Sequence, residues 1–183
     1  MMEYTALLRG INVGGNKIIK MEELRLLCGT LGLVGAQTLL QSGNVVFRSA
    51  EKDRVKLTGR LEGGIQKKFG FDVRIVVRTA ADLRRVIDEN PFKASKMPNL
   101  GLLQVMFLDA KPEARAFVDL RSSYKGPEEM HLVGEELYIY YCNGAGKSKL
   151  TNDLIQRKLQ VTGTARNWNT VQKLLALTEA LKK

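Results

Sequence analysis

The fold is decided by residues 36–48, which read AQTLLQSGNVVFR. Two apolar runs, 36–41 and 45–48, lie on either side of the tripeptide Ser42-Gly43-Asn44. Glycine beside asparagine between apolar runs is typical of a β-hairpin turn, because both residues tolerate a positive φ. The stretch therefore predicts two antiparallel strands joined by a tight turn.

Helices and further strands are predicted on both sides of this hairpin. Upstream, residues 4–8 form a β-rich apolar run, and apolar residues recur at helical spacing over 21–31. Downstream, large apolar residues recur every four positions over 51–69, residues 73–77 predict a strand, and residues 80–88 predict a short helix. The first half therefore contains a strand, a helix, a hairpin, a second helix and a last strand, followed by a trailing helix.

The same order of elements returns in the second half, after a proline-containing linker over 90–99. Its predicted elements are a strand over 102–108, a helix opened by Pro112, hairpin strands over 130–133 and 136–141, a helix over 148–159, a strand over 161–165 and a helix over 169–181. We therefore predict an α+β protein of two ferredoxin-like (βαββαβ) subdomains, residues 1–92 and 93–183, with a C-terminal helix. One face of each sheet stays uncovered in this plan and has to meet water, a ligand or the other half.

Composition and charge narrow the class of protein. The chain has 183 residues, a formal net charge of +10 and a pI of about 9.7. No apolar run approaches the roughly 20 residues of a membrane helix, and the N-terminal residues do not resemble a signal peptide. Cys28 and Cys142 lack metal-ligand spacing and are expected to be free thiols. These features predict a cytoplasmic protein. Its charge suits an anionic small molecule or nucleic acid, although basic proteins without such partners are common.

A glycine-rich stretch, Asn143-Gly144-Ala145-Gly146-Lys147-Ser148, follows a predicted strand and precedes a predicted helix. It is not a P-loop, because Tyr141 occupies the position where that motif requires its first glycine. Amide groups at a helix start, with Lys147 and Lys149 beside them, would favour a bound anion. The alternative is a simple turn in which Ser148 caps the helix.

Two polar turns of the first half are further candidates. The loop after the first strand carries Arg9, Asn12, Gly14, Gly15 and Lys17, and its glycine spacing does not match the dinucleotide-binding fingerprint. The hairpin turn adds the polar residues Gln41, Ser42 and Asn44. For both turns, a ligand-facing role and a purely structural turn remain open.

Residues 166–170 read Arg166-Asn167-Trp168-Asn169-Thr170 and precede the last helix. Either asparagine can cap that helix, and Trp168 is the only tryptophan, which is expected to bury much of its area. The alternative interpretation is a binding surface made of Arg166, Asn167 and Trp168.

Tyr138 and Tyr140 alternate along one predicted strand with residues expected to face the helices. RNA-recognition modules stack bases on such open-face aromatics, but their full consensus is absent here, so packing between the two halves is favoured. His131 is the only histidine and has no nucleophile near it in sequence. We therefore predict no metal site and no cofactor, and the sequence leaves open whether the protein is an enzyme.

Several motifs taken together resemble a known bacterial family. Leu8-Arg9-Gly10-Ile11-Asn12-Val13-Gly14-Gly15 and Gln41-Ser42-Gly43-Asn44-Val45 are similar to the opening of the domain-of-unknown-function 1697 family. Ser148-Lys149-Leu150 and Arg166-Asn167-Trp168-Asn169-Thr170-Val171 are similar to its closing motifs. The resemblance implies two ferredoxin-like subdomains in a bacterial protein. It implies no activity and no catalytic residue.

The leading hypothesis is a protein that binds an anionic ligand or nucleic acid at its polar turns. The expected ligand-binding residues are Arg9, Asn12, Gly14, Gly15, Lys17, Gln41, Ser42, Asn44, Lys147, Ser148, Lys149, Arg166, Asn167 and Trp168. They are expected to converge on a cleft where the two halves meet. The alternatives are an enzyme acting on a phosphorylated small molecule and a regulatory or scaffolding dimer. The sequence does not determine the oligomeric state.

Overall fold

The computed structural model describes residues 1–92 and 98–181. By its internal contacts the chain divides into two compact units. The first unit consists of Met1–Arg85 with Lys173–Lys183, and the second of Val86–Gln172. The predicted division into subdomains 1–92 and 93–183 stays a prediction. Five residues of the predicted linker, 93–97, lie outside the described residues.

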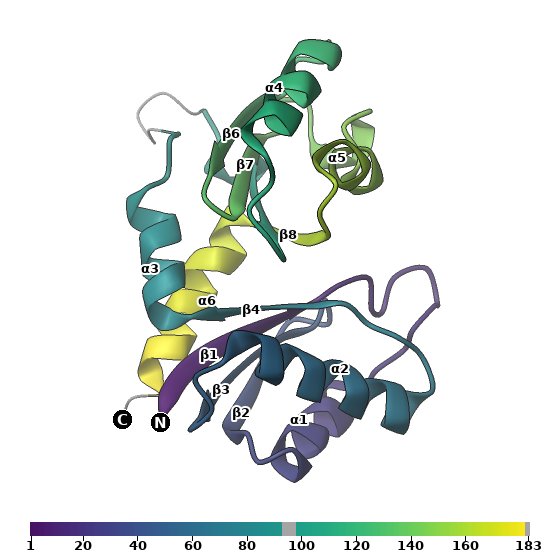
Figure 1. Cartoon of the computed structure of the whole chain (residues 1–183), viewed down its shortest axis with the longest axis vertical. Coiled ribbons are helices and arrows are strands. Elements are labelled where there is room, and N and C mark those ends of the chain that lie inside the picture. The colour runs from purple at the N-terminus through teal and green to yellow at the C-terminus, as the bar shows by residue number, and fades with distance from the viewer. Residues whose placement is uncertain (93–97, 182–183) are drawn as a thin grey trace. The chain divides into compact units, whose positions relative to one another are not determined.

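The first unit contains a four-stranded antiparallel sheet in the order β2-β3-β1-β4. Its elements in chain order are β1 (Met2–Leu8), α1 (Met21–Thr30), β2 (Val34–Leu39), β3 (Asn44–Ser49), α2 (Arg54–Phe69) and β4 (Ile75–Thr79). Helices α1 and α2 cover the same face of this sheet (Figure 1). The predicted βαββαβ order is confirmed in this unit.

Alternation along β1 explains which residues face the two helices. Tyr4, Ala6 and Leu8 are fully buried in one apolar cluster with Leu57 and Leu61 of α2. Helix α2 begins after Asp53, whose carboxylate accepts the backbone N–H groups of residues 55 and 56. It ends at a glycine in the left-handed conformation, residue 70, with a φ of 80°.

The opposite face of this sheet is also buried. Thr5 and Leu7 are fully buried, and the Thr5 Oγ1 lies 2.7 Å from the Oγ1 of Thr178 in α6 (Trp168–Ala180). The hydroxyl of Thr178 also hydrogen-bonds the carbonyl of Leu174, one turn earlier. The last turns of α6 therefore cover the face that the sequence left open.

The second unit repeats the plan with the strand order β6-β7-β5-β8. Its elements are β5 (Leu103–Leu108), α4 (Ala114–Ser123), β6 (Glu129–Val133), β7 (Glu136–Tyr140), α5 (Asn152–Leu159) and β8 (Gly163–Asn167), with short 3₁₀ turns η2 (Leu100–Leu102) and η3 (Ala145–Lys147). Met106 and Leu108 of β5 pack with Leu120 of α4 and Ile155 of α5. The βαββαβ order is confirmed here too, and the protein has an α+β fold of two ferredoxin-like subdomains.

Tyr138 lies on the face of the second sheet away from α4 and α5, as predicted. Its hydroxyl donates to the carbonyl of Val86, in the last turn of α3 (Ala80–Asp88), over 2.7 Å. Tyr140 lies on the same face against Phe92, with ring centroids 6.1 Å apart. Both tyrosines are thus buried and anchor a segment of the chain to the sheet.

Two predicted helix starts are wrong, and for α5 the reason is the position of the capping side chain. Pro112 does not open α4, because the N-cap is Glu113 and the helix begins at Ala114. Ser148 does not cap α5, because the Thr151 side chain accepts the N–H of Leu154 and the helix begins at Asn152. Residues 147–150, which come before this cap, are therefore not part of α5.

We predict that Gly43→Ala lowers the thermal unfolding midpoint, whereas Gly59→Ala raises it. Gly43 has a φ of 77°, and an added Cβ would lie 2.7 Å from both Leu8 Cβ and Ile11 Cδ1, so the cost should be about 2–4 kcal/mol. Gly59 is exposed in α2 and an added Cβ meets nothing within 4 Å, so alanine should gain about 0.5–1 kcal/mol. Equal midpoints for the two variants in a melting experiment would contradict this assignment.

Candidate anion-binding site

A pocket of about 590 Å³ lies in the second unit, between the end of α4 and the loop before α5. Two chain segments line it, residues 124–128 and residues 143–149, together with Leu154. Its polar lining side chains include Tyr124, Lys125, Glu128, Lys147, Ser148 and Lys149. Three ammonium groups and one carboxylate therefore border a single hollow.

Backbone turns and hydrogen bonds fix the position of residues 143–149 at the pocket. Gly144 has a φ of 84°, which turns the chain out of β7, and its carbonyl accepts the N–H of Lys147 in η3. The Ser148 Oγ then accepts the N–H of Leu150 over 2.9 Å. The carbonyl of Leu150 is held in turn by the hydroxyl of the buried Tyr141 over 3.2 Å. These bonds fix the loop that carries Lys147 and Lys149.

Glu128 is the acceptor at the centre of the pocket. The Tyr124 hydroxyl donates to its Oε2 over 2.5 Å and lies 3.4 Å from the Ser148 Oγ. Burial acts to raise the pKa of Glu128, but hydrogen bonds from Ser148 and Tyr124 outweigh it and hold that pKa below its usual value. Burial, followed by the bond to Glu128, raises the pKa of Tyr124. The carboxylate is therefore ionised, and Tyr124 stays a neutral donor.

The lysines of the pocket are not neutralised by neighbouring acids. Within residues 1–92 and 98–181, Lys125, Lys147 and Lys149 form no ion pair. Against the single charge of Glu128, the pocket keeps a net positive charge of two. Such a site attracts anions, and the two hydroxyl groups hold its one carboxylate in place.

In the first unit, the structure brings the two predicted polar turns together through Asn12. Its Nδ2 donates to the carbonyls of Ile19 and Gln41 over 3.0 and 2.8 Å, and its Oδ1 accepts the N–H of Ile19 over 2.8 Å. Both amide hydrogens are therefore used to fasten the loop to the hairpin turn. Asn12 builds this corner of the unit and does not offer its amide to a ligand.

Some of the other residues of these turns hydrogen-bond within the fold, and others lie at the surface. Asn44 is buried and donates to the carbonyl of Leu39 and to Ser42 Oγ, which closes the hairpin turn. Lys17 donates to the carbonyl of Asp72 over 2.6 Å. Gly14 and Gly15 have positive φ values of 58° and 76° and lie exposed at the tip of the loop, while Arg9 is half-buried at its base.

Arg166, Asn167 and Trp168 belong to the second unit but do not line its lysine pocket. The buried Arg166 donates to Thr164 Oγ1 and to the carbonyl of Ala165, and burial lowers its pKa to about 10. Asn167 donates to the carbonyl of Gly101 over 2.5 Å and its Oδ1 accepts the N–H of Asn169 at the start of α6. With Trp168 only 4% exposed, this stretch serves to anchor α6 to its sheet.

Sequence reasoning missed Tyr124, Lys125 and Glu128. The only available signal was the turn Lys125-Gly126-Pro127 after a predicted helix, and nothing in it indicates which loop it will meet. Within the described part of the chain, no group of three metal-ligating side chains gathers. No described helix is long and apolar enough to cross a membrane.

Comparison with known proteins gives a family and a fold. A family model described as a protein of unknown function, DUF1697, matches residues 1–138, which leaves the two closing motifs outside the match. No curated protein matches the chain. A solved structure of a conserved bacterial protein from Streptococcus pneumoniae is similar over 97% of this chain and 98% of its own, with a TM-score of 0.75 and 20% identity. That likeness supports the two-subdomain fold, and the family match shows that the chain belongs to the DUF1697 family of proteins of unknown function.

Proposed function

We propose that this protein binds a phosphate-bearing small molecule in the lysine pocket of its second unit. The observation that carries the proposal is the meeting of Lys125, Lys147 and Lys149 at one hollow without an ion-pair partner. Lysine is a common ligand for phosphate groups, to which it offers a flexible point charge. The pocket volume of about 590 Å³ falls within the range of small-molecule sites.

Glu128 adds a second element of recognition to the proposed pocket. A carboxylate beside three ammonium groups repels a bare anion but accepts hydrogen bonds from hydroxyl or amino groups. Tyr124 and Ser148 hold the carboxylate at the pocket, and each carboxylate oxygen can accept more than one hydrogen bond, so acceptor capacity remains for a ligand donor. The favoured ligand therefore carries a phosphate group at one end and a hydroxyl or amine at the other.

We further propose that this binding takes place in the cytoplasm of a bacterium. Cys28 and Cys142 are both free thiols, which suits a reducing compartment. Cys28 is buried among apolar residues, and burial raises its pKa to about 12, so this thiol stays protonated. The structural neighbour comes from a bacterium, as its description states.

Phosphorylated ligands should raise the thermal unfolding midpoint of the full chain, and replacement of the pocket lysines should remove the effect. The probes are pyrophosphate, a nucleoside monophosphate and a hexose phosphate. A ligand at 100 times its Kd stabilises the folded state by about 2.7 kcal/mol. Lys147→Gln with Lys149→Gln should weaken binding at least tenfold. The control pair, Lys20→Gln with Lys52→Gln, removes the same charge from exposed sites of the first unit and should leave binding unchanged. No response to any probe, or equal losses in both pairs, would refute the proposed site.

We expect Glu128→Gln to change the affinity for inorganic phosphate more than the affinity for the favoured ligand class. Gln keeps an oxygen that can accept from Tyr124 and Ser148 but removes the negative charge from the pocket. Inorganic phosphate should therefore bind several times more tightly to this variant, as titration calorimetry would measure. A phosphate ester with a free hydroxyl or amino group should gain less, because its own donor loses a charged acceptor. Unchanged or weaker binding of inorganic phosphate would contradict the predicted electrostatic repulsion by Glu128.

A further inference from the structure

The positive charge of this protein is concentrated in its first unit. Residues 1–85 and 173–183 hold eighteen lysine and arginine residues against nine acidic ones, a net charge of +9. Residues 86–172 hold eleven basic and ten acidic residues, a net charge of +1. The proposed lysine pocket is thus a local feature of a nearly neutral unit, and the excess charge of the chain requires a separate explanation.

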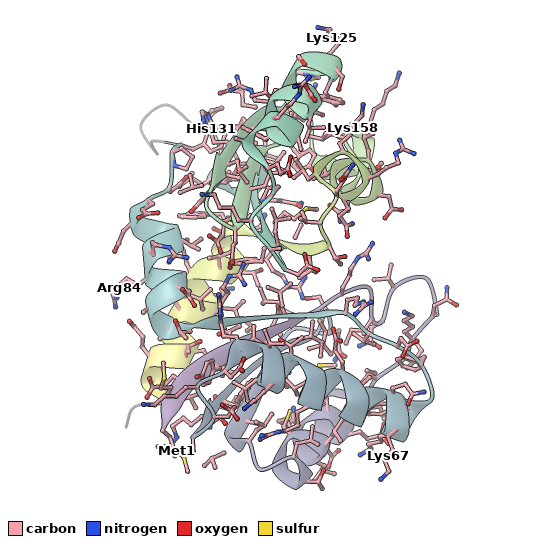
Figure 2. All side chains as sticks on the ribbon, viewed as in Figure 1. Met1, Lys67, Arg84, Lys125, His131 and Lys158 are labelled. Atoms are coloured by element: carbon pink, nitrogen blue, oxygen red, sulfur yellow. The ribbon has the colours of Figure 1, made fainter. Side chains whose placement is uncertain are left out.

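Much of this excess lies on α2. The helix carries five basic residues and a single acidic one, Glu62. Its outer stripe is defined here as Lys56, Gly59, Arg60, Gly63, Gln66 and Lys67, which are exposed and turned away from the buried Leu57, Leu61 and Ile65. The exposed Val55 lies beside the first turn of this stripe. These residues follow the three- and four-residue spacing of one helix face, and none of them is acidic. Lys67 projects from the C-terminal part of the helix into solvent (Figure 2).

The cations of the outer stripe differ from other basic side chains of the first unit. Arg54, Arg74 and Arg84 each face a carboxylate of the same unit. By contrast, Lys56 and Lys67 form no ion pair within residues 1–92 and 98–181, and the Nη1 of Arg60 reaches only the carbonyl of Leu31, at 3.5 Å. The pKa of the Glu51 carboxylate is lowered by a hydrogen bond from the backbone N–H of Asp53 and also, through space, by the charge of Lys56. Even so, the outer stripe is a place where cations lack direct ion-pair partners among the described residues.

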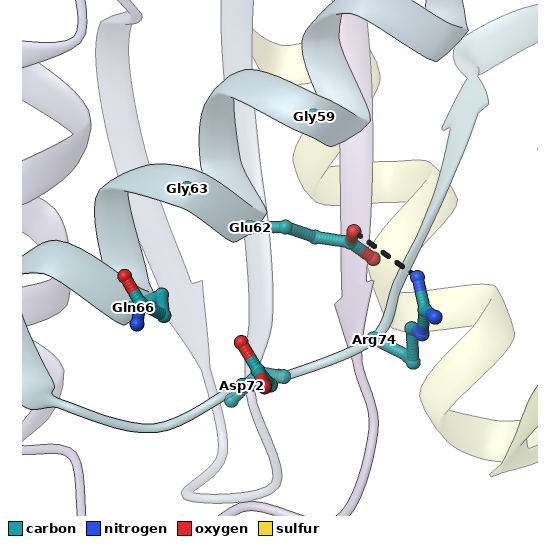
Figure 3. Close-up of a pocket in the computed structure, with 7 residues that line it drawn as sticks. Gly59, Glu62, Gly63, Gln66, Asp72 and Arg74 are labelled. Carbon is teal, nitrogen blue, oxygen red and sulfur yellow. Dashed lines mark ion pairs between the residues drawn. The ribbon is translucent and has the colours of Figure 1, made fainter.

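No side chain projects from two of the positions beside these cations, because both are glycines. Gly59 and Gly63 lie one turn apart on the outside of α2 (Figure 3), and a Cβ built on either meets no atom within 4 Å. They border a hollow of about 630 Å³ between α2 and the loop before β4. In that hollow Glu62 is paired with Arg74 over 3.6 Å and also accepts the N–H of Ile75, so its charge is largely satisfied. Asp72 lies on the loop across the hollow and not on the helix.

We propose that the outer stripe of α2 docks on the phosphate backbone of double-stranded DNA. The argument is charge complementarity. A regular line of cations without ion-pair partners among the described residues, in a unit with a net charge of +9, matches a regular line of phosphates. The stripe has no aromatic side chain on which an unstacked base could lie, which favours a duplex over a single strand. The major groove of B-form DNA admits an α-helix, and contacts to phosphates alone carry no sequence information. This surface is independent of the pocket proposed above.

Fluorescence anisotropy with a labelled duplex of mixed sequence tests this surface on the full chain. Binding is expected in the micromolar range, about 10⁻⁴–10⁻⁶ M near physiological salt, and should weaken steeply as salt is raised. Replacing Lys56, Arg60 and Lys67 together by Gln should weaken binding at least tenfold. The salt slope of log K should fall by about 2.7 in magnitude, because three phosphate contacts are lost. All three side chains are exposed, so the fold should be unaffected.

Two further variants make the result decisive. Lys111→Gln, Arg121→Gln and Lys158→Gln together remove the same charge, also from two lysines and one arginine, at exposed positions of the second unit, and should change affinity less than twofold. Gly59→Glu with Gly63→Glu should abolish binding while the thermal midpoint stays at or above that of the parent, because both sites have open space. The proposal is overturned by no binding at low salt, by equal losses in the two triple variants, or by tighter binding of single-stranded DNA or RNA than of the duplex.

Discussion

The close approach of Gly43 to β1 is the constraint on which the first unit depends. The Gly43 carbonyl accepts the N–H of Leu8 over 2.8 Å, and no side chain fits between this residue and Leu8 or Ile11. This contact brings the hairpin turn against the loop that follows β1. Only then can the Asn12 amide reach the carbonyl of Gln41 and fix the loop. The absence of a Cβ at Gly43 thus allows contact between two turns whose bonded residues, Asn12 and Gln41, are 29 positions apart in sequence.

The sequence was sufficient to predict the order of elements, because alternation and helical spacing record which side of each element is buried. Leu137 and Ile139 face the helices while Tyr138 faces the other way, as their alternation required. The destination of the trailing helices was not predictable in this way. Thr5 alternates with apolar neighbours as a solvent-facing residue would, yet it is buried beneath Thr178. The sequence pattern does not distinguish a buried threonine that hydrogen-bonds another threonine from an exposed one that hydrogen-bonds water.

Prediction of the candidate site was limited by a similar ambiguity among polar residues. Asn12, Asn44 and Asn167 all occur in turns where a ligand-facing role was plausible, and each instead donates to backbone carbonyls. Irregular segments leave such carbonyls without the partners that strands and helices provide, and asparagine supplies them locally. Lys147 and Lys149 line a pocket, and their role in ligand binding stays a prediction. Tyr124 and Glu128, which line the same pocket, come from a distant turn whose pairing only the fold reveals.

The two proposed surfaces differ in how their cationic side chains are arranged. In the turns, the asparagine amides donate to backbone carbonyls. The groups that we propose for partners are long cationic side chains that form no ion pair with any described residue. Where such cations gather around a hollow with a fixed carboxylate, as near Glu128, the geometry favours a small ligand with two kinds of polar group. Where they follow one exposed face of a helix, as on α2, no enclosure limits the partner's size, and an extended anion fits the arrangement better than a compact one. The two proposed partners therefore differ in size because one group of cations borders a hollow and the other follows an open helix face.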